Sequence, residues 1–224
     1  MSAPTIVAID GPAGVGKTTV ARRLAERLGL PVLDTGAMYR AFALYVLDHG
    51  LAEDVATLAE AIARLPLEVE RRADAVTLDI VLDGEPVGDR IRTQEVSEMT
   101  SRLSTQPVVR ERMVALQRTC AAVHGAVVEG RDIGTVVFPH TPHKFFLDAR
   151  PDVRARRRHG DLARKGGTTP ELAEVERDLA RRDERDRSRE AAPLRYDDSY
   201  VLIDTSDRDV EAIVDDMMTA MTGR

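Results

Sequence analysis

The chain has 224 residues, of which 43% are hydrophobic, 31% are charged and only 4% are aromatic. This composition is typical of a globular protein with one core of ordinary size, and it excludes a disordered or membrane chain. The formal net charge of −6 gives no overall attraction to nucleic acid. A lone cysteine, Cys120, excludes a disulfide framework, and no apolar run is long enough to span a bilayer. We therefore expect a cytoplasmic protein with neither a nucleic-acid nor a membrane partner.

The segment GPAGVGKT, residues 11–18, lies between an apolar run and a helical pattern. It satisfies G-x-x-x-x-G-K-[ST], in which glycines let backbone N–H groups surround a phosphate at the N-terminus of a helix. Lys17 is expected to contact the outer phosphates of a nucleotide, and the Thr18 hydroxyl to bind Mg²⁺. The predicted ATP-binding residues of this loop are Gly11, Pro12, Ala13, Gly14, Val15, Gly16, Lys17, Thr18 and Thr19.

Five apolar runs predict the strands of a parallel sheet in an α/β fold, at residues 5–10, 31–34, 126–129, 143–148 and 200–204. Ligands of such sheets bind beyond the carboxyl ends of the strands. This rule places Thr35, Tyr39 and Arg40 near the nucleotide, because they follow the second strand. Alternatively, the Asp34–Thr35 pair could simply cap the next helix.

The third predicted strand delivers Arg131 and Asp132 to the same edge of the sheet. Their opposite charges suit a polar ligand, although the two side chains could instead pair only with each other. After the fifth strand, Ser206 is the expected cap of a final helix that runs to Met221.

Residues 51–103 have a different character. A short helical stretch is followed by alternating runs at residues 67–70, 76–82 and 85–87, with an Asp83-Gly84 turn before the last. This pattern predicts a small antiparallel sheet, and therefore a lobe inserted into the α/β core. Two helices then follow, over residues 93–103 with Thr93 as cap, and over residues 108–123.

Residues 150–189 are rich in arginine and poor in large apolar side chains, so we expect two helices that are not deeply buried. The Lys165-Gly166-Gly167 break between them predicts a movable lid that faces phosphate. Most of these arginines would pair with acidic residues at helical spacing. Arg182, Asp186 and Arg189 follow one another at steps of four and three, so they could converge on one ligand.

Taken together, these segments resemble the bacterial cytidylate kinases over essentially the whole chain. The resemblance is carried by IDGPAGVGKTT, LDTGAMYR, IRTQEVSEMTS, VVEGRDIGTVVFP, KFFLDA and RRDERDRSREAAPL. It implies an ATP-dependent kinase that phosphorylates CMP or dCMP in pyrimidine nucleotide metabolism, with Mg²⁺ as cofactor, acting as a monomer. It also implies a P-loop kinase core of residues 1–36, 104–149 and 190–224, a nucleoside-monophosphate (NMP) lobe of residues 37–103, and a helical lid of residues 150–189.

The resemblance also assigns roles to individual residues. Arg110 and Asp132 would recognise cytosine; Ser101, Arg182 and Asp186 would meet the pentose; Thr35 would line the acceptor pocket; and Arg40, Arg131 and Arg189 would hold the acceptor phosphate. Lys17, Arg40, Arg131 and Arg189 would be the catalytic residues, with Arg154 and Arg157 as lid contacts to ATP. Two departures from relatives are Thr18 where the loop often reads G-K-G-T, and Thr35 where some relatives have serine.

Three other interpretations compete with this one. The first is a P-loop kinase for another small acceptor, such as UMP, AMP, shikimate or a sugar. The second is a GTP-binding switch, which would need the strings N-K-x-D and D-x-x-G, and neither occurs. The third is an RNA-binding module built on the arginine-rich segment, but acidic residues are interleaved there and aromatic stacking residues are missing.

Overall fold

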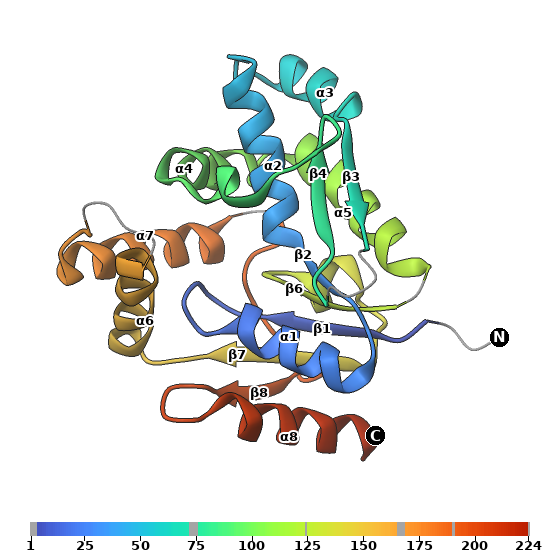
Figure 1. Ribbon diagram of the computed structural model, residues 1–224, viewed down its shortest axis with the longest axis vertical. Helices are drawn as coiled ribbons and strands as arrows, with labels where there is room; N and C mark the ends of the chain where they lie inside the picture. The colour runs from blue at the N-terminus through green and yellow to red at the C-terminus, as the bar shows by residue number, and fades with distance from the viewer. Residues whose placement is uncertain (1–3, 72–75, 124, 165–168, 190, 224) are drawn as a thin grey trace.

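The structure, a computed structural model, describes residues 4–71, 76–123, 125–164, 169–189 and 191–223. A parallel sheet with the strand order β2-β6-β1-β7-β8 lies at its centre (Figure 1). Its strands are β1 (Ile6–Asp10), β2 (Val32–Asp34), β6 (Ala126–Gly130), β7 (His143–Asp148) and β8 (Val201–Asp204), and a π-helical turn, η2 (Ile133–Val137), follows β6. The predicted α/β class and its five core strands are confirmed.

Helices cover both faces of this sheet. Side chains alternate between the faces along a strand: Val7 and Ile9 pack with α1 (Lys17–Leu28) and α8 (Val210–Thr222). Ala8, between them, packs on the opposite face with α2 (Thr35–Asp48) and α5 (Pro107–Ala122). Both faces are thus apolar and covered, as parallel sheets require, so polar chemistry is confined to the strand ends.

Capping side chains determine where several helices begin. The Asp34 carboxylate accepts a hydrogen bond of 2.9 Å from the Ala37 N–H, so the predicted capping role at this position is confirmed. The prediction that Ser206 caps the last helix is wrong, because α8 starts at Val210 and Asp209 caps it. The Ser206 hydroxyl donates instead to Asp204. Among the described helices, none combines the length and the apolar character needed to cross a bilayer.

The inserted lobe contains a three-stranded antiparallel sheet, as predicted. Its elements are α3 (Val55–Ala63), β3 (Leu67–Glu70), β4 (Asp79–Leu82), β5 (Glu85–Pro86), the 3-10 helix η1 (Gly88–Arg92) and α4 (Gln94–Leu103). The run 76–82 differs from the prediction in one respect. The Val32 N–H donates to the Val76 carbonyl (2.8 Å) and the Leu78 N–H donates to the Val32 carbonyl (2.9 Å), so residues 76–78 lie beside β2. Val76 packs against the core there, which explains why the apolar run is divided between two sheets.

Two helices, α6 (Pro151–Arg164) and α7 (Leu172–Ser188), form the arginine-rich segment. The predicted lysine-glycine break falls within residues 165–168, outside the described residues. Exposed ion pairs at helical spacing occur as expected: Arg156–Asp152, Arg164–Asp161 and Arg181–Asp178. The expectation of shallow burial is wrong for Arg154, Asp183 and Asp186, which are buried charged residues. They can be buried because each has an oppositely charged partner.

A truncation between α1 and the sheet tests this packing. Leu24 is fully buried there. We expect Leu24→Ala to lower the free energy of unfolding by about 2–5 kcal/mol, because it leaves a cavity that the sheet cannot fill. Leu202→Ala is the matched control: Leu202 is 55% exposed, so the same truncation should cost less than about 1 kcal/mol. Urea denaturation of both variants measures the difference, and equal losses would contradict the assigned core.

Candidate active site

Three loops meet at the carboxyl edge of the sheet. Asp34 of β2 is in register with Glu129 of β6, and Asp10 of β1 is in register with Gly130 of β6. From these strand ends the chain continues into the glycine-rich loop, into α2 and into the segment that begins with Arg131. The predicted convergence of these segments at one edge is therefore observed.

Two glycines of the glycine-rich loop occupy positions where a side chain would be strained. Gly11 and Gly14 have φ values of 150° and 79°. A Cβ on Gly11 would lie 2.1 Å from the Leu147 carbonyl oxygen, and one on Gly14 would lie 3.1 Å from the Arg154 carbonyl oxygen. The loop leads directly into the N-terminus of α1 at Lys17, where unpaired N–H groups and the helix dipole attract anions.

Lys17 and Glu129 are buried residues of opposite charge next to the loop, and each affects the pKa of the other. The Lys17 ammonium donates to the carbonyls of Gly11 (2.9 Å) and Pro12 (2.7 Å). Burial, followed by the positive charge of Arg131, lowers the pKa of Lys17. Burial, followed by the neighbouring Asp34 carboxylate, raises the pKa of Glu129. Burial thus disfavours the charged forms of both side chains. A phosphate beside Lys17, or a cation beside Glu129, would stabilise the charged form.

Two clefts adjoin this loop. The first, of about 460 Å³, lies between the loop, α6 and the start of α8, and Arg157, Thr205 and Arg208 are among its lining residues. The second, of about 530 Å³, extends towards α2, α4 and α7. Gly14, Lys17 and Thr18 line both, so a group held at the loop is within reach of each cleft.

The second cleft brings together most of the site residues expected from sequence: Lys17, Thr18, Thr35, Arg40, Arg110, Arg131, Asp132, Arg182, Asp186 and Arg189. Nine Lys or Arg side chains and five Asp or Glu side chains line it, so its charge favours an anion. Ser101 is not among the lining residues. Ser97, Thr100 and Ser104, from the same helix and its C-terminal end, line the cleft instead. The contact of Ser101 with a pentose therefore stays a prediction.

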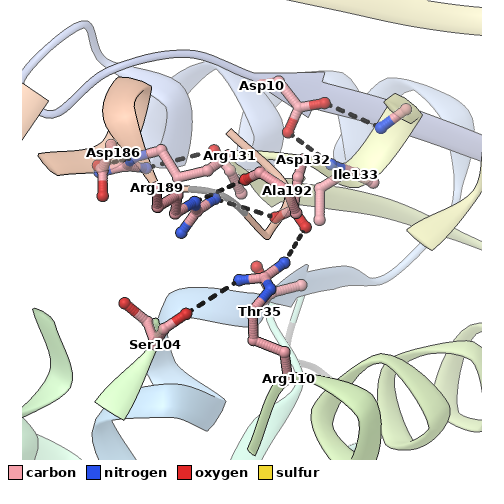
Figure 2. A network of polar contacts seen from close by, with 12 residues as sticks. Asp10, Thr35, Ser104, Arg110, Arg131, Asp132, Ile133, Asp186, Arg189 and Ala192 are labelled. Atoms are coloured by element: carbon pink, nitrogen blue, oxygen red, sulfur yellow. Dashed lines mark hydrogen bonds and ion pairs between the residues drawn. The ribbon is translucent and has the colours of Figure 1, made fainter. Parts of the chain in front are cut away.

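Two of the residues that line this cleft, Arg110 and Asp132, form a buried ion pair (Figure 2). The Arg110 guanidinium donates to the Asp132 carboxylate and to the Ser104 carbonyl (3.3 Å). A second guanidinium, of Arg189, lies 3.7 Å from the other Asp132 oxygen. Asp132 does not pair with its neighbour Arg131, so the alternative of an isolated Arg131–Asp132 pair is wrong. Asp132 presents a fixed carboxylate, which can accept hydrogen bonds from a ligand.

The other arginines of the cleft crowd one another. Arg131 donates to Asp186 (2.9 Å). Burial, followed by the charge of Arg131, lowers the pKa of Arg182 to about 10, and burial also lowers the pKa of Arg189. The buried Nε of Arg40 and a buried Nη of Arg189 lack a hydrogen-bond partner. A bound anion would supply partners and relieve the repulsion.

The two lid arginines predicted to contact ATP differ in their surroundings. Arg157 donates to the Thr205 hydroxyl (3.0 Å) and carbonyl (2.6 Å) and lines the first cleft. Arg154 lines neither cleft: it donates to Asp183 (2.5 Å) and to the Ala13 carbonyl (3.2 Å). Arg154 therefore connects α6, α7 and the glycine-rich loop, and its contact with ATP stays a prediction.

The structure adds residues that the motifs had not singled out. Glu129 and Arg158 line the second cleft, and Arg164 lines both. The signal for Glu129 was an acidic residue at the end of a predicted buried strand. Arg158 could not be distinguished from the many exposed arginines around it. Thr35, in contrast, was expected, and its hydroxyl donates to the Glu129 carbonyl (2.7 Å), which fixes the start of α2 beside β6.

A model of the cytidylate kinase family matches residues 7–223. The chain belongs to the cytidylate kinase family. It is 44% identical to a cytidylate kinase of Nitratidesulfovibrio vulgaris over 98% of this chain and 93% of that protein, and 44% identical to one of Corynebacterium diphtheriae over 96% and 93%. A crystal structure of an uncharacterised protein from Eubacterium ventriosum has a similar fold, with a TM-score of 0.51 at 16% identity over 98% of this chain and 99% of that one.

Substitution of the buried Arg154–Asp183 pair tests whether Arg154 is structural. We expect Arg154→Met to lower the free energy of unfolding by about 3–5 kcal/mol, because Asp183 is left buried without a partner. Arg154→Met combined with Asp183→Leu should recover most of that loss in urea denaturation. Arg156→Met is the control on the exposed side of α6, with an expected change below about 0.5 kcal/mol. If the double variant stayed as unstable as Arg154→Met alone, the loss would not come from an unpaired Asp183, and the structural role of the pair would be contradicted.

Proposed function

We propose that this protein transfers the γ-phosphoryl group of ATP to CMP or dCMP, giving ADP and CDP or dCDP. The observation that carries the proposal is the buried Asp132 carboxylate, held by Arg110 in a cationic cleft that meets a second cleft at the glycine-rich loop. Membership of the cytidylate kinase family supports the same acceptor. Among the other acceptors considered from sequence, UMP, shikimate and sugars have no exocyclic amine from which this carboxylate could accept a hydrogen bond.

ATP would bind with its triphosphate in the glycine-rich loop and its nucleoside in the first cleft. The backbone N–H groups of residues 13–19, which lead into α1, suit the β-phosphate. Lys17 suits the γ-phosphate once its ammonium leaves the loop carbonyls. Arg157 and Arg208 provide positive charge beside the nucleoside. This arrangement leaves the γ-phosphorus at the junction of the two clefts.

The acceptor would occupy the second cleft. Asp132 can accept a hydrogen bond from the exocyclic amine of cytosine, and Arg110 can donate to its ring acceptors. Asp186 and Arg182 would contact the pentose, with Ser101 as a further predicted contact. Arg40, Arg131 and Arg189 would hold the acceptor phosphate. One buried nitrogen each of Arg40 and Arg189 lacks a hydrogen-bond partner, and all three guanidinium groups line the cleft, which suits a dianion.

In the reaction, an oxygen of the acceptor phosphate forms a bond to the γ-phosphorus, and the bond from that phosphorus to the β–γ bridging oxygen breaks. The acceptor is already an anion, so no strong general base is needed. Lys17, Arg40, Arg131 and Arg189 would act by holding both nucleotides in line and by stabilising the negative charge of the transition state. The lid, residues 150–189, and the NMP lobe, residues 37–103, would close over the nucleotides and exclude water.

Residues at the loop also fit Mg²⁺. The Thr18 hydroxyl is near enough to Glu129 to lower the pKa of its carboxyl, and the Glu129 Oε1 atom is buried without a hydrogen-bond partner. A hydroxyl and an uncompensated carboxylate oxygen are hard ligands of the kind that Mg²⁺ prefers. When bound, the ion would neutralise charge on the phosphates. Thr18 would contact it directly, and Glu129 would hold it directly or through water.

An acceptor panel tests the proposal. We expect rapid ADP release from Mg-ATP with CMP and dCMP, and little with UMP, AMP, shikimate or no acceptor. Asp132→Asn should lower kcat/KM for CMP by about 10–100-fold, the range expected for a hydrogen bond to a charged group. UMP should be affected less, because an amide can donate to the uracil carbonyl.

Asp178→Asn, on the exposed side of α7, is the matched control and should leave both acceptors unchanged. Equal turnover of UMP and CMP by the unaltered enzyme would rule out base selection by Asp132. Absence of acceptor-dependent turnover throughout would reject the proposed reaction.

The metal site is tested separately. We expect Glu129→Gln to raise the Mg²⁺ concentration that gives half-maximal turnover by about tenfold, because one ionic ligand is lost. Electron paramagnetic resonance of Mn²⁺ with ATP should show correspondingly weaker binding. Glu176→Gln, at an exposed position on α7, should change neither quantity. Unaltered Mn²⁺ affinity in Glu129→Gln would exclude Glu129 from the metal site.

A further inference from the structure

Asp10, at the end of β1, is a fully buried carboxylate that lines neither cleft. One of its oxygens accepts a hydrogen bond from the Ile133 N–H (2.8 Å), and the other accepts one from the Gly134 N–H (2.9 Å). Figure 2 shows Asp10 on the side of Ile133 that faces away from Arg110. A carboxylate in this position is costly unless it is fully hydrogen-bonded, so its contacts call for a physical explanation.

The two N–H groups belong to the first turn of η2, directly after Asp132. The first N–H groups of a helical turn have no partner within it, and an aspartate at the preceding position commonly caps them with its own side chain. Asp132 occupies that preceding position, yet its side chain makes no capping hydrogen bond. Asp10 supplies the cap from a neighbouring strand. The Asp132 carboxylate is thereby free to turn into the second cleft and pair with Arg110.

Tyr200 contacts both Asp10 and the first turn of η2. The Tyr200 hydroxyl donates to the Asp10 oxygen that also binds Gly134 (2.7 Å). The backbone of Gly134 is pressed against the same phenol, since a Cβ at this position would lie 2.5 Å from the Tyr200 oxygen. Tyr200 in turn packs with Phe146 and Leu194. Tyr200 therefore fixes the position of the Asp10 carboxylate relative to the first turn of η2.

We propose that Asp10 is a positioning residue for acceptor recognition: by capping η2, it keeps Asp132 out of the capping position and directed at the acceptor base. The inference rests on the proposed function, because it assumes that Asp132 meets that base. It assigns an acceptor-side role to a residue adjacent to the phosphate loop, in addition to the favourable charge interaction of Asp10 with Lys17.

Steady-state kinetics of Asp10→Asn test the proposal. An amide presents an N–H₂ group to one of the two backbone donors, so one end of the cap is lost and Asp132 can turn back to replace it. We expect the KM for CMP to rise about tenfold and the preference for CMP over UMP to fall about tenfold, the factor that corresponds to the loss of one good hydrogen bond. The KM for ATP should change less than about twofold, because the contacts of the phosphate loop are retained.

Thr141→Val is the matched control for a purely structural loss. Thr141 donates to the Ile6 carbonyl of the same strand (2.5 Å) and lies at the far end of the same β6–β7 connection. It should lower stability, measured by urea denaturation, without a change in the KM for CMP. Tyr200→Phe is a second variant that keeps the cap but removes its support, and it should raise the KM for CMP by about two- to fivefold.

The outcomes separate the two proposals. If the unaltered enzyme prefers CMP but Asp10→Asn behaves like Thr141→Val, with lower stability and the same KM for CMP, the role of Asp10 is overturned while the reaction stands. Equal increases in the KM for ATP and for CMP would also overturn it, because Asp10 would then act through the phosphate loop. If Asp10→Asn does not fold, an unchanged KM for CMP in Tyr200→Phe overturns the role. An unaltered enzyme that does not use CMP would reject both proposals.

Discussion

Positive charge concentrated at one edge of the sheet is the constraint on which the rest of the site depends. Lys17, Arg40, Arg131, Arg182 and Arg189 approach the same cleft, and their mutual repulsion disfavours the compact state. The fold offsets this repulsion with carboxylates placed at strand ends and on α7. Each carboxylate neutralises part of the charge without filling the cleft, so the arginines remain oriented before a nucleotide enters. Such preorganisation reduces the reorganisation that binding and phosphoryl transfer require.

The division of the carboxylates between two tasks explains their burial. Asp183 and Asp10 hold backbone and helices in place and line neither cleft. Asp132 and Asp186 hold arginines and also face the cleft, where a ligand can reach them. Asp10 accepts hydrogen bonds from the first N–H groups of η2, and this leaves the Asp132 carboxylate available to a ligand. The arrangement depends on strands β1 and β6 being neighbours with Asp10 and Gly130 in register.

The sequence allowed the phosphate loop, the five core strands and the inserted sheet to be predicted, because each depends on adjacent residues or on a short period. Arg154 could not be placed in this way. Its partners Asp183 and Ala13 are 29 and 141 positions away, and its own stretch contains many similar arginines. Glu129 was indistinguishable from any polar residue that ends a strand. The run 76–82 predicted a strand correctly, but an apolar pattern does not indicate which of two sheets will receive it.

The parallel pairing of residues 76–78 with Val32 has a consequence for the behaviour of the protein in a crowded solution. β2 is the last strand of the core sheet on its side, and an uncovered outer strand is a template for association with another chain. The hydrogen bonds between Val32 and the backbone of Val76 and Leu78 occupy donor and acceptor groups of that strand. The inserted segment therefore covers part of this edge of the core sheet, where an unpaired strand could otherwise bind another chain.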